Sequence, residues 1–311
     1  MRDDGEGAER VKDFIEFVNE HELGKIRENV SFKQLTSLKI GGTARCLYEP
    51  NSLDNLMIAY KYLKNRQIPT YAIGNGTNLL VSDDRFDLVL IKLTKCNGFK
   101  PLSEGRFMME AGCQSGTVGR IIAKLGYSGS AFMGVIPGTV GGLIYMNSGA
   151  YKKEVADFLY QCDYLDAKGD LVSLTEGFNF GYRESIFQSI DCLIIRGFFK
   201  FPLAPKGEEP YQTINRYLEL KRNTQPLNER NAGSVFRNPP HIHAWEIIDA
   251  LGYRGFSVGD AGVSMKHANF LVNKGNATFE EMAKLVELIQ TDAKKYYNID
   301  LKCEWKILKK L

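Results

Sequence analysis

Two glycine-dense loops in this chain contain backbone N–H groups that could bind an anion. The first runs from Gly74 to Asn78 and the second from Gly134 to Gly142, and each follows an apolar segment. Glycines allow left-handed backbone and let consecutive amide N–H groups approach one anion. Thr77, Asn78 and Thr139 add side-chain donors. Two such loops suit a diphosphate, whereas either loop alone is more simply interpreted as a tight turn at the end of a strand.

The distribution of glycine points to the same region. Residues 74–149 hold 14 of the 30 glycines of this 311-residue chain. The stretch of residues 126–151 carries no charged side chain and lies almost entirely within that region. By length it could span a bilayer, but its seven glycines, Pro137 and several polar residues predict buried irregular backbone instead.

The common phosphate-binding and nucleophile motifs are absent from the sequence. A dinucleotide-binding fingerprint needs a third glycine three residues after the second, and Leu79 stands at that position. The P-loop signature fails because Ile26 follows Gly24-Lys25. The GxSxG motif fails because Ser130 follows residues 126–129. The glycine loops therefore indicate neither a Rossmann fold nor a P-loop enzyme.

The composition is that of an ordinary globular chain, with 44% hydrophobic and 25% charged residues and a length that predicts about two domains. Forty Lys+Arg against 37 Asp+Glu leave a net charge of +3, which does not mark a binder of nucleic acid or of membrane surfaces. Six scattered cysteines and a charged N-terminus predict free thiols and a cytoplasmic location. The four histidines lack metal-ligand spacing, so no metal site is expected.

Hydrophobic periodicity predicts the elements that position the two loops. A helix is expected behind Ser52, with apolar residues at helical spacing through Leu63, and short strands are expected at 70–73, 79–83 and 88–93. A hairpin is expected around Lys168-Gly169. This alternation of strands and helices indicates an α+β or α/β fold.

The last third of the chain is predicted to have its own helical core. Residues 202–210 look like a linker, with three prolines and no apolar periodicity. Helices are expected near 211–222 and 244–251, and a long helix is expected behind the capping box of Thr278 and Glu281. A final strand is expected within residues 300–308.

Six separated segments give the chain a specific resemblance to the MurB family, the UDP-N-acetylenolpyruvoylglucosamine reductases of bacterial peptidoglycan synthesis. They occur in the order and approximate spacing of that family: TSLKIGGTA (36–44), AIGNGTNLLVSD (72–83), GVIPGTVGGLIYMNSGAY (134–151), FGYRESIF (180–187), NAGSVFRNP (231–239) and VSMKHANFLVN (263–273). The resemblance covers the chain from about Asn29 to Leu308.

The resemblance implies an α+β fold of the vanillyl-alcohol-oxidase-like (PCMH-type) FAD-binding class. It implies an α+β FAD-binding subdomain at 1–93 that is rejoined by 301–311, a second α+β FAD-binding subdomain at 94–204 and an α+β UDP-sugar domain at 205–300. NADPH would reduce the bound FAD, which would then reduce UDP-N-acetylglucosamine enolpyruvate to UDP-N-acetylmuramate. These small molecules are the expected partners, without nucleic acid, a membrane or an obligate protein partner.

The same resemblance assigns roles to individual residues. Arg183 would stabilise the enolate-like intermediate, Ser234 would donate the proton that quenches it, and Glu304 would assist that stabilisation. The residues expected to bind FAD are Gly74, Asn75, Gly76, Thr77, Asn78, Leu79, Gly138, Thr139, Val140, Gly141, Gly142, Asn147 and Gly149. The residues expected to bind the substrate are Arg222, Gln225, Arg237, Asn238, Lys266, His267 and Asn269.

Taken singly, these residues also have ordinary structural interpretations. Arg183 would be a salt-bridging surface arginine, Ser234 a loop hydroxyl and Glu304 a solvated strand residue. Lys266 would be a surface lysine and His267 a hydrogen-bonded, partly buried histidine. Only their occurrence within the six-segment pattern favours the functional interpretation.

The sequence departs from the family pattern in several places, among them Asp260, where a second glycine is common, and Trp245, which replaces a small residue. Glu304 lies between Cys303 and Trp305, where the family usually has proline and valine, and Lys152 stands where glycine is common. The segment 188–191 is short where longer members carry a loop whose tyrosine closes over the substrate, so this chain resembles the shorter type. Two alternatives remain open at this stage: an FAD oxidase of the same fold, and a flavin or UDP-sugar binding module without turnover.

Overall fold

The structure, a computed structural model, describes residues 4–310 and divides into two compact units. The first unit contains the chain up to Asn29 together with residues 44–74 and 87–218. The second contains residues 30–43, 75–86 and the chain from Glu219 onward. The three-part division expected from the resemblance stays a prediction.

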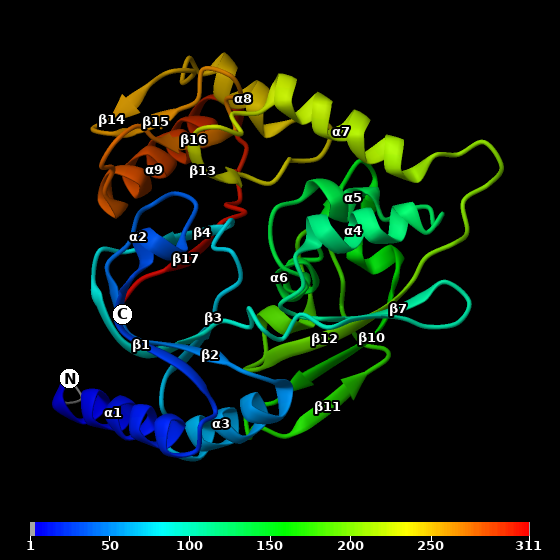
Figure 1. Ribbon diagram of the computed structural model, residues 1–311. Coiled ribbons are helices and arrows are strands. Elements are labelled where there is room, and N and C mark those ends of the chain that lie inside the picture. The colour runs from blue at the N-terminus through cyan, green and yellow to red at the C-terminus, as the bar shows by residue number, and fades with distance from the viewer. Residues whose placement is uncertain (1–3, 311) are drawn as a thin grey trace. The chain divides into compact units, whose positions relative to one another are not determined.

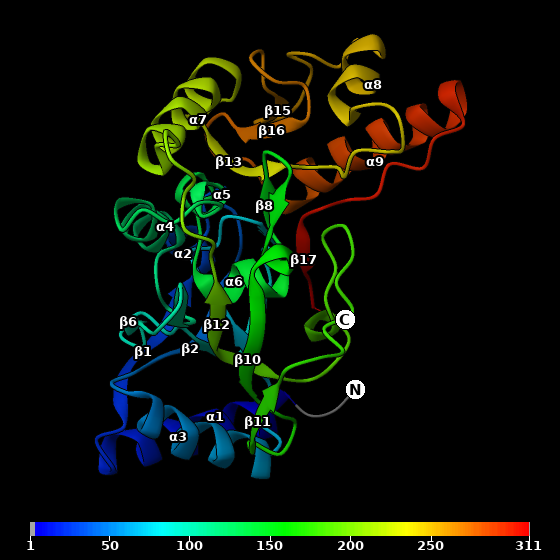
Figure 2. The ribbon, with the colours of Figure 1, turned by 90° about the vertical axis from the view of Figure 1, so that its right-hand side faces the viewer.

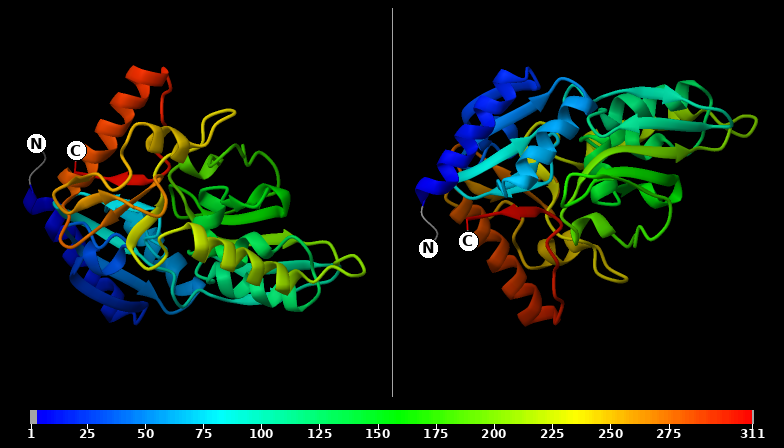
Figure 3. Two further views of the ribbon diagram at one scale, coloured as in Figure 1. Left: turned by 90° about the horizontal axis from the view of Figure 1, so that it is seen from above. Right: turned by 90° about the horizontal axis from the view of Figure 1, so that it is seen from below.

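A four-stranded sheet with two covering helices forms one part of the first unit. Its strand order is β1 (Gly24–Ser31), β2 (Thr43–Pro50), β5 (Arg85–Ile91) and β3 (Thr70–Ala72). The helices α1 (Asp4–Glu20) and α3 (Leu53–Asn65) lie side by side against this sheet (Figures 1 and 3). The predicted start of α3 is confirmed, since Ser52 Oγ accepts a hydrogen bond from Asn55 N at 3.1 Å.

The helix α1 was not predicted, although it contributes to the core of the first unit. Val11, Phe14 and Val18 repeat at helical spacing on α1 and are fully buried. Phe14 packs edge-on against Tyr48 of β2, with ring centroids 5.5 Å apart. The N-terminal segment is therefore an integral part of this unit.

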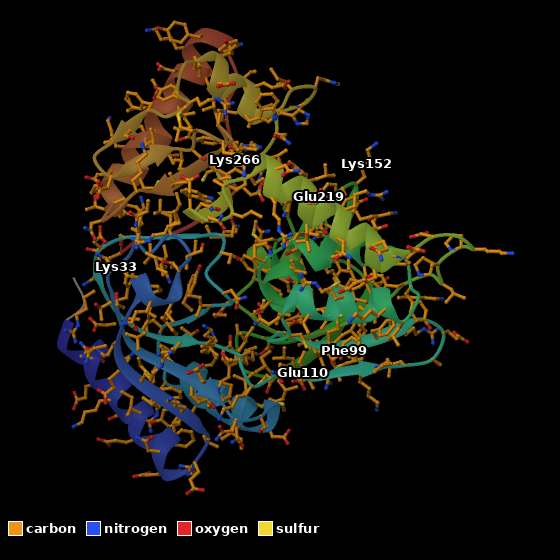
Figure 4. The ribbon with its side chains drawn as sticks, turned by 45° about the horizontal axis from the view of Figure 1, so that its top comes forward. Lys33, Phe99, Glu110, Lys152, Glu219 and Lys266 are labelled. Carbon is orange, nitrogen blue, oxygen red and sulfur yellow. The ribbon has the colours of Figure 1, made fainter. Side chains whose placement is uncertain are left out.

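A five-stranded antiparallel sheet forms the other part of the first unit. Its order is β11 (Leu171–Leu174), β10 (Leu159–Leu165), β12 (Leu193–Lys200), β7 (Arg106–Glu110) and β6 (Phe99–Pro101). The predicted hairpin is confirmed: Gly169 has a φ of +78° and its N–H donates to Asp166 O at 2.9 Å. Phe99 and Glu110 are labelled on this sheet in Figure 4.

The uncharged stretch contains two short helices in addition to the irregular backbone that the sequence predicted, so that prediction was wrong in part. The helix α4 (Ser115–Lys124) precedes it, and it contains the short helices α5 (Ala131–Val135) and α6 (Val140–Tyr145). All of α5 is buried, as are Val140, Leu143 and Ile144 of α6, so the expected burial is confirmed. A hairpin of β8 (Gly149–Ala150) and β9 (Lys153–Glu154), followed by the 3-10 turn η1 (Val155–Asp157), ends the segment.

The second unit contains two sheets as well as helices, as the α+β composition implied by the resemblance predicts, so its core is not helical alone. One sheet is antiparallel, with β13 (Arg230–Ser234), β16 (Phe270–Asn273), β15 (Ala261–Val263) and β14 (Ser257–Val258) in that order. The helices α8 (Ala244–Ala250) and α9 (Phe279–Tyr297) pack beside it (Figure 2). The other sheet pairs β4 (Leu79–Val81) with β17 (Lys306–Leu308), and α2 (Phe32–Leu35) belongs to the same unit.

Several predictions for the C-terminal third are confirmed. The capping box of α9 forms as expected, with Thr278 Oγ1 and the Glu281 carboxylate each accepting a backbone N–H of the other residue. The helix α7 (Pro210–Thr224) follows the predicted linker. No helix within residues 4–310 has the length and apolarity needed to cross a membrane.

Candidate active site

Arg183 lies in the first unit, at a central position of a tight turn. The N–H groups of Gly181 and Glu184 each donate to the carbonyl of the other residue at 3.1 Å, which leaves Tyr182 and Arg183 as the central residues. Arg183 has a φ of +62°, an unfavourable backbone conformation for a residue with a side chain. Its half-buried guanidinium donates from Nη2 to Gly149 O at 2.9 Å.

The second glycine loop is tied to the turn that follows β7. Val140 N and Gly141 N donate to the carbonyls of Cys113 and Ala111, both at 2.9 Å. A side chain at Gly141 would place its Cβ 2.9 Å from the Ala111 Cβ. Because the N–H groups of Val140 and Gly141 are already bonded within the protein, they do not converge on an anion.

The two glycine loops meet at Gly74 and Thr139. A Cβ at Gly74 would lie 2.7 Å from Thr139 Oγ1, so only glycine allows this approach. Thr139 also caps α6, its Oγ1 accepting from Gly142 N at 3.4 Å. One ligand is therefore within reach of the start of the first loop and the threonine of the second.

The remainder of the first loop lies in the second unit, where the TSLKIGG segment holds it. Ser37 donates to Gly76 O from its backbone N at 3.1 Å and from Oγ at 3.2 Å. Gly76 has a φ of +62°, and a Cβ there would approach Leu35 O to 2.2 Å. Ser37 has a supporting role that the site prediction missed, although its segment was part of the resemblance.

Ser234, Glu304 and Asn78 are brought together in the second unit. Ser234 ends β13, and the neighbouring Val235 accepts a hydrogen bond from Glu304 N at 2.7 Å. Asn78 of the first loop donates from Nδ2 to Glu304 O at 3.2 Å and accepts from Lys306 N at 3.0 Å. Two catalytic candidates and one cofactor candidate, distant in sequence, thus share one small region.

The backbone beside Ser234 is irregular and open. The pairing of β13 with β16 shifts register between Asn231 and Ser234, and Gly233 within the shift has a φ of +76°. A Cβ built at Gly233 has no atom within 4 Å, so the space there is open. This bulge turns the strand at the residue expected to supply a proton.

Asn269 holds the strand that follows Ser234. Its Oδ1 accepts from Phe236 N at 3.0 Å and its Nδ2 donates to Phe236 O at 2.8 Å, in a side chain that is almost fully buried. Its main-chain carbonyl accepts from Val235 N at 2.9 Å. Its side-chain amide therefore serves the protein, and the expected role in substrate binding stays untested.

Other predicted residues also have structural roles. Asn147 is fully buried, and its amide bonds Gly181 O and Ala156 N, both at 2.9 Å. Gly149 allows the β8–β9 hairpin to close, since a Cβ there would lie 2.7 Å from Lys153 O. Asn238 accepts from Ala244 N at 3.0 Å, at the start of α8. Lys152, with a φ of +62°, points outward from that hairpin (Figure 4).

A cavity of ≈ 430 Å³ in the second unit collects three of the expected substrate residues. It is lined by Arg222, Gln225, Pro226, Leu227, Asn228, Glu229 and Lys266. Lys266, labelled in Figure 4, donates from Nζ to Arg222 O. Two cationic side chains against one carboxylate give the cavity a positive character suited to an anion.

Burial sets the protonation of two groups near these residues. Burial raises the pKa of the Cys303 thiol to about 11, so Cys303 remains uncharged beside Glu304 near neutral pH. Burial, together with the charge of Arg254, lowers the pKa of His267. His267 is therefore neutral at pH 7 and adds no positive charge for an anionic substrate.

Comparison with known proteins defines the class first. Residues 44–175 match the profile of an FAD binding domain. The fold is also that of the berberine bridge enzyme from Eschscholzia californica, with a TM-score of 0.50, 14% identity and coverage of 62% of this chain and 43% of that one. The chain is an FAD-binding protein with a PCMH-like α+β fold, as predicted.

The family follows from closer relatives. Residues 225–308 match the C-terminal domain of UDP-N-acetylenolpyruvoylglucosamine reductase. The reductase of Caldanaerobacter subterraneus is 35% identical over 287 residues, which cover 92% of this chain and 94% of that protein. The reductase of Thermotoga petrophila is 36% identical, and the alignment covers 88% of this chain and 95% of that protein. The MurB crystal structure from Thermus caldophilus aligns with a TM-score of 0.77 and 30% identity, over 91% of this chain and all of that one. The chain belongs to the MurB family.

The residues present fit the cofactor that this class implies. Close contacts with Thr139, Leu35 and Ala111 require glycine at Gly74, Gly76 and Gly141, and these contacts fix the backbone of the two loops. Thr139 and Asn78 supply polar groups at the two loops. Where Gly74 meets Thr139 in the first unit, the two loops are therefore compatible with FAD.

Proposed function

We propose that this chain reduces UDP-N-acetylglucosamine enolpyruvate to UDP-N-acetylmuramate with FAD and NADPH, in the cytoplasm, as an enzyme of peptidoglycan precursor synthesis. The observation that carries the proposal is the meeting of Ser234, Glu304 and Asn78, which joins two catalytic candidates to a cofactor loop. Membership of the family supports the same reaction. The alignment covers 94% of the Caldanaerobacter reductase and all of the Thermus caldophilus MurB chain.

When bound, FAD supplies the two-electron transfer from NADPH to the enolpyruvyl double bond. In our proposal Arg183, a permanent cation, stabilises the negative charge that develops beside the substrate carboxylate. Ser234 delivers a proton to the carbon that becomes the new stereocentre. Glu304, bonded through its backbone to Val235, helps to fix the position of the Ser234 segment and the charge balance around it.

The substrate is proposed to place its diphosphate near the cationic cavity. Arg222 and Lys266 are the charged donors there, and Gln225 adds an amide. Arg237, Asn238, His267 and Asn269 remain proposed substrate residues on the resemblance alone. We retain the division into two FAD-binding subdomains and a UDP-sugar domain as part of the proposal.

The test is a turnover assay on the purified protein. The purified protein should be yellow, and its oxidation of NADPH should accelerate when the enolpyruvyl UDP-sugar is added. Protein that remains inactive after reconstitution with FAD would contradict the proposal. Peroxide formation that is independent of any UDP-sugar would favour an oxidase instead.

The variant Ser234→Ala separates the two half-reactions. Reduction of the flavin by NADPH should persist, whereas product formation should fall by about 10² to 10⁴-fold, the usual contribution of a positioned proton donor. The matched control is Ser189→Ala, because the exposed Ser189 hydroxyl bonds only locally, to Ile186 O at 2.8 Å. Unchanged product formation in Ser234→Ala would show that Ser234 is not the donor.

A further inference from the structure

Gln188 bonds directly to the backbone of Arg183. Its Nε2 donates to Arg183 O at 3.0 Å and also to Tyr145 O at 2.9 Å. Gln188 ends the 3-10 turn η2 (Ile186–Gln188), and its side chain is half-buried. One amide group thus connects the turn of the proposed catalytic arginine to the last residue of α6.

The same turn has further support from buried side chains. Asn147 donates from Nδ2 to Gly181 O at 2.9 Å, which is the residue that opens the turn. Ser185, which follows the turn, donates from Oγ to Tyr145 O at 2.7 Å. Both ends of the Tyr182–Arg183 turn are therefore held by hydrogen bonds from side chains of the same unit.

The helix α6 relates this turn to the second glycine loop. The loop runs into α6 at Thr139 and Val140, and the carbonyl of Tyr145 at its other end accepts from Gln188 and Ser185. Six helical residues span about 9 Å. The glycine loop and the Arg183 turn are thus connected through a short helix whose Val140, Leu143 and Ile144 are buried.

The backbone of Arg183 needs such support. A φ of +62° is disfavoured for a residue with a side chain and persists only where surrounding contacts fix it. A hydrogen bond to the Arg183 carbonyl restrains the peptide plane that follows its Cα. The direction in which the guanidinium leaves the turn depends on that restraint.

We propose that Gln188 is a positioning residue for Arg183, setting the direction of the guanidinium relative to the second glycine loop through the end of α6. The inference rests on the proposed function, because it assigns Arg183 to the reaction. Gln188 acts on the arginine, not on the substrate.

The principal test is Gln188→Met, which keeps the length and packing of the side chain and removes its donor. Reduction of the flavin by NADPH should stay within about twofold of the wild type. The following half-reaction, in which the enolpyruvyl sugar is reduced, should slow by about 10 to 10²-fold in kcat with a smaller change in KM, as expected for a misplaced catalytic group. An equal loss in both half-reactions, or no loss in the second, would overturn the proposal.

A double-mutant cycle distinguishes positioning from a general structural role. In an Arg183→Ala background, adding Gln188→Met should lower kcat of the second half-reaction by less than a further twofold, because the arginine that Gln188 positions is already absent. Independent, multiplying losses would overturn the inference. Gln161→Met is the matched control: it removes an amide donor to Asp163 in the same unit and should leave both half-reactions unchanged.

A second readout does not depend on catalysis. The Glu184 N–H, bonded to Gly181 O, should exchange with solvent deuterium at least several-fold faster in Gln188→Met than in the wild type. Unchanged exchange across residues 178–189 would overturn the inference. Wild-type protein without NADPH turnover would instead contradict the proposed function, while the exchange result still decides whether Gln188 holds the turn.

Discussion

The carboxylate of Asp163, on β10, accepts hydrogen bonds from three side chains. Gln161 Nε2, Ser173 Oγ and Arg196 Nε approach its oxygens to 3.0, 2.7 and 2.6 Å, and the residue is 1% exposed. Burial alone would raise the pKa of Asp163, but these hydrogen bonds and the Arg196 charge outweigh it and lower the pKa below 3.8. The ionised form is thus part of the folded structure of the five-stranded sheet.

We predict that Asp163→Asn removes a pH-dependent part of the stability. Because the pKa is lower in the folded state, the ionised carboxylate stabilises the protein fully above the unfolded-state pKa, and this stabilisation is lost as the pH falls through the folded pKa. At pH 7 the variant should lose about 2 to 3 kcal/mol, the usual range for a hydrogen bond to a charged group. Urea unfolding from pH 7 to pH 3 should show the difference shrinking below about pH 4.

The exposed pair Asp249–Arg254 provides the control for that measurement. Its bonds are as short, 2.7 Å and 2.8 Å, and the Arg254 hydrogen bond lowers the pKa of Asp249 as well. Both side chains are about one-third exposed, however. Asp249→Asn should therefore cost less than about 1 kcal/mol, and an equal cost at the two positions would contradict the role assigned to burial.

At the scale of elements, the first glycine loop depends on Gly76. A Cβ at Gly76 would meet Leu35 O, whereas at Gly252, which has a φ of +79°, a Cβ would meet no atom within 4 Å. Gly252→Ala should therefore lower the free energy of unfolding only by the cost of a left-handed backbone conformation for alanine, about 1 to 2 kcal/mol. Gly76→Ala should cost more and should also displace the loop, because the Leu35 carbonyl cannot yield without moving the backbone at the end of α2.

Denaturant unfolding and the flavin content after dialysis measure this pair of variants. We expect Gly252→Ala to retain its flavin and Gly76→Ala to lose most of it. Equal flavin retention in both variants would show that the Gly74–Asn78 loop does not hold the cofactor. The comparison separates the backbone cost, which both variants share, from the close approach that only Gly76 has.

Elements with strong local signals could be predicted from the sequence. The capping box of α9 and the Ser52 cap of α3 are short-range patterns, and both helices begin where those patterns place them. The helix α6 could not be predicted, because it begins with Val140, Gly141 and Gly142, residues of low helix propensity, and is stabilised by its burial. The strands β14 and β15 are only two and three residues long, too short for an alternating pattern.

The candidate site was also predictable only in part, because short-range sequence patterns do not encode long-range packing. Arg183 and Ser234 were recognised through their segments, but spacing alone does not place Asn78 against Glu304, 226 residues away. Nor does the sequence reveal that the amides of Asn147 and Asn269 are buried and bonded within the protein. Such assignments depend on long-range packing, which local propensity does not encode.

At the scale of the whole molecule, the C-terminal strand completes a sheet that begins early in the chain. Lys306, Ile307 and Leu308 of β17 pair in parallel with Leu79, Leu80 and Val81 of β4 (Figure 1). All three residues of β4 are buried, and Ser82 N adds a bond to Leu308 O at 2.9 Å. The strand that follows the first glycine loop therefore depends on the last residues of the chain.

We predict that deleting residues 306–311 destabilises the protein and releases the flavin. Losing the backbone bonds of β17 should cost about 2 to 3 kcal/mol, at about 1 kcal/mol each, and should free the Asn78 carbonyl from Lys306 N. Thermal unfolding and flavin absorbance measure both effects. Deleting only residues 309–311 is the control and should change neither; a stable, fully yellow protein lacking 306–311 would contradict the role given to β17.

The pairing of β4 with β17 also has a consequence for biosynthesis. Leu79 leaves the ribosome 227 residues before Lys306, its partner, which corresponds to a delay on the order of tens of seconds at ordinary rates of translation. During that interval an apolar strand next to the first glycine loop lacks its neighbour. We therefore expect nascent chains to be unable to retain flavin, and the cofactor to be acquired only after the finished polypeptide has been released.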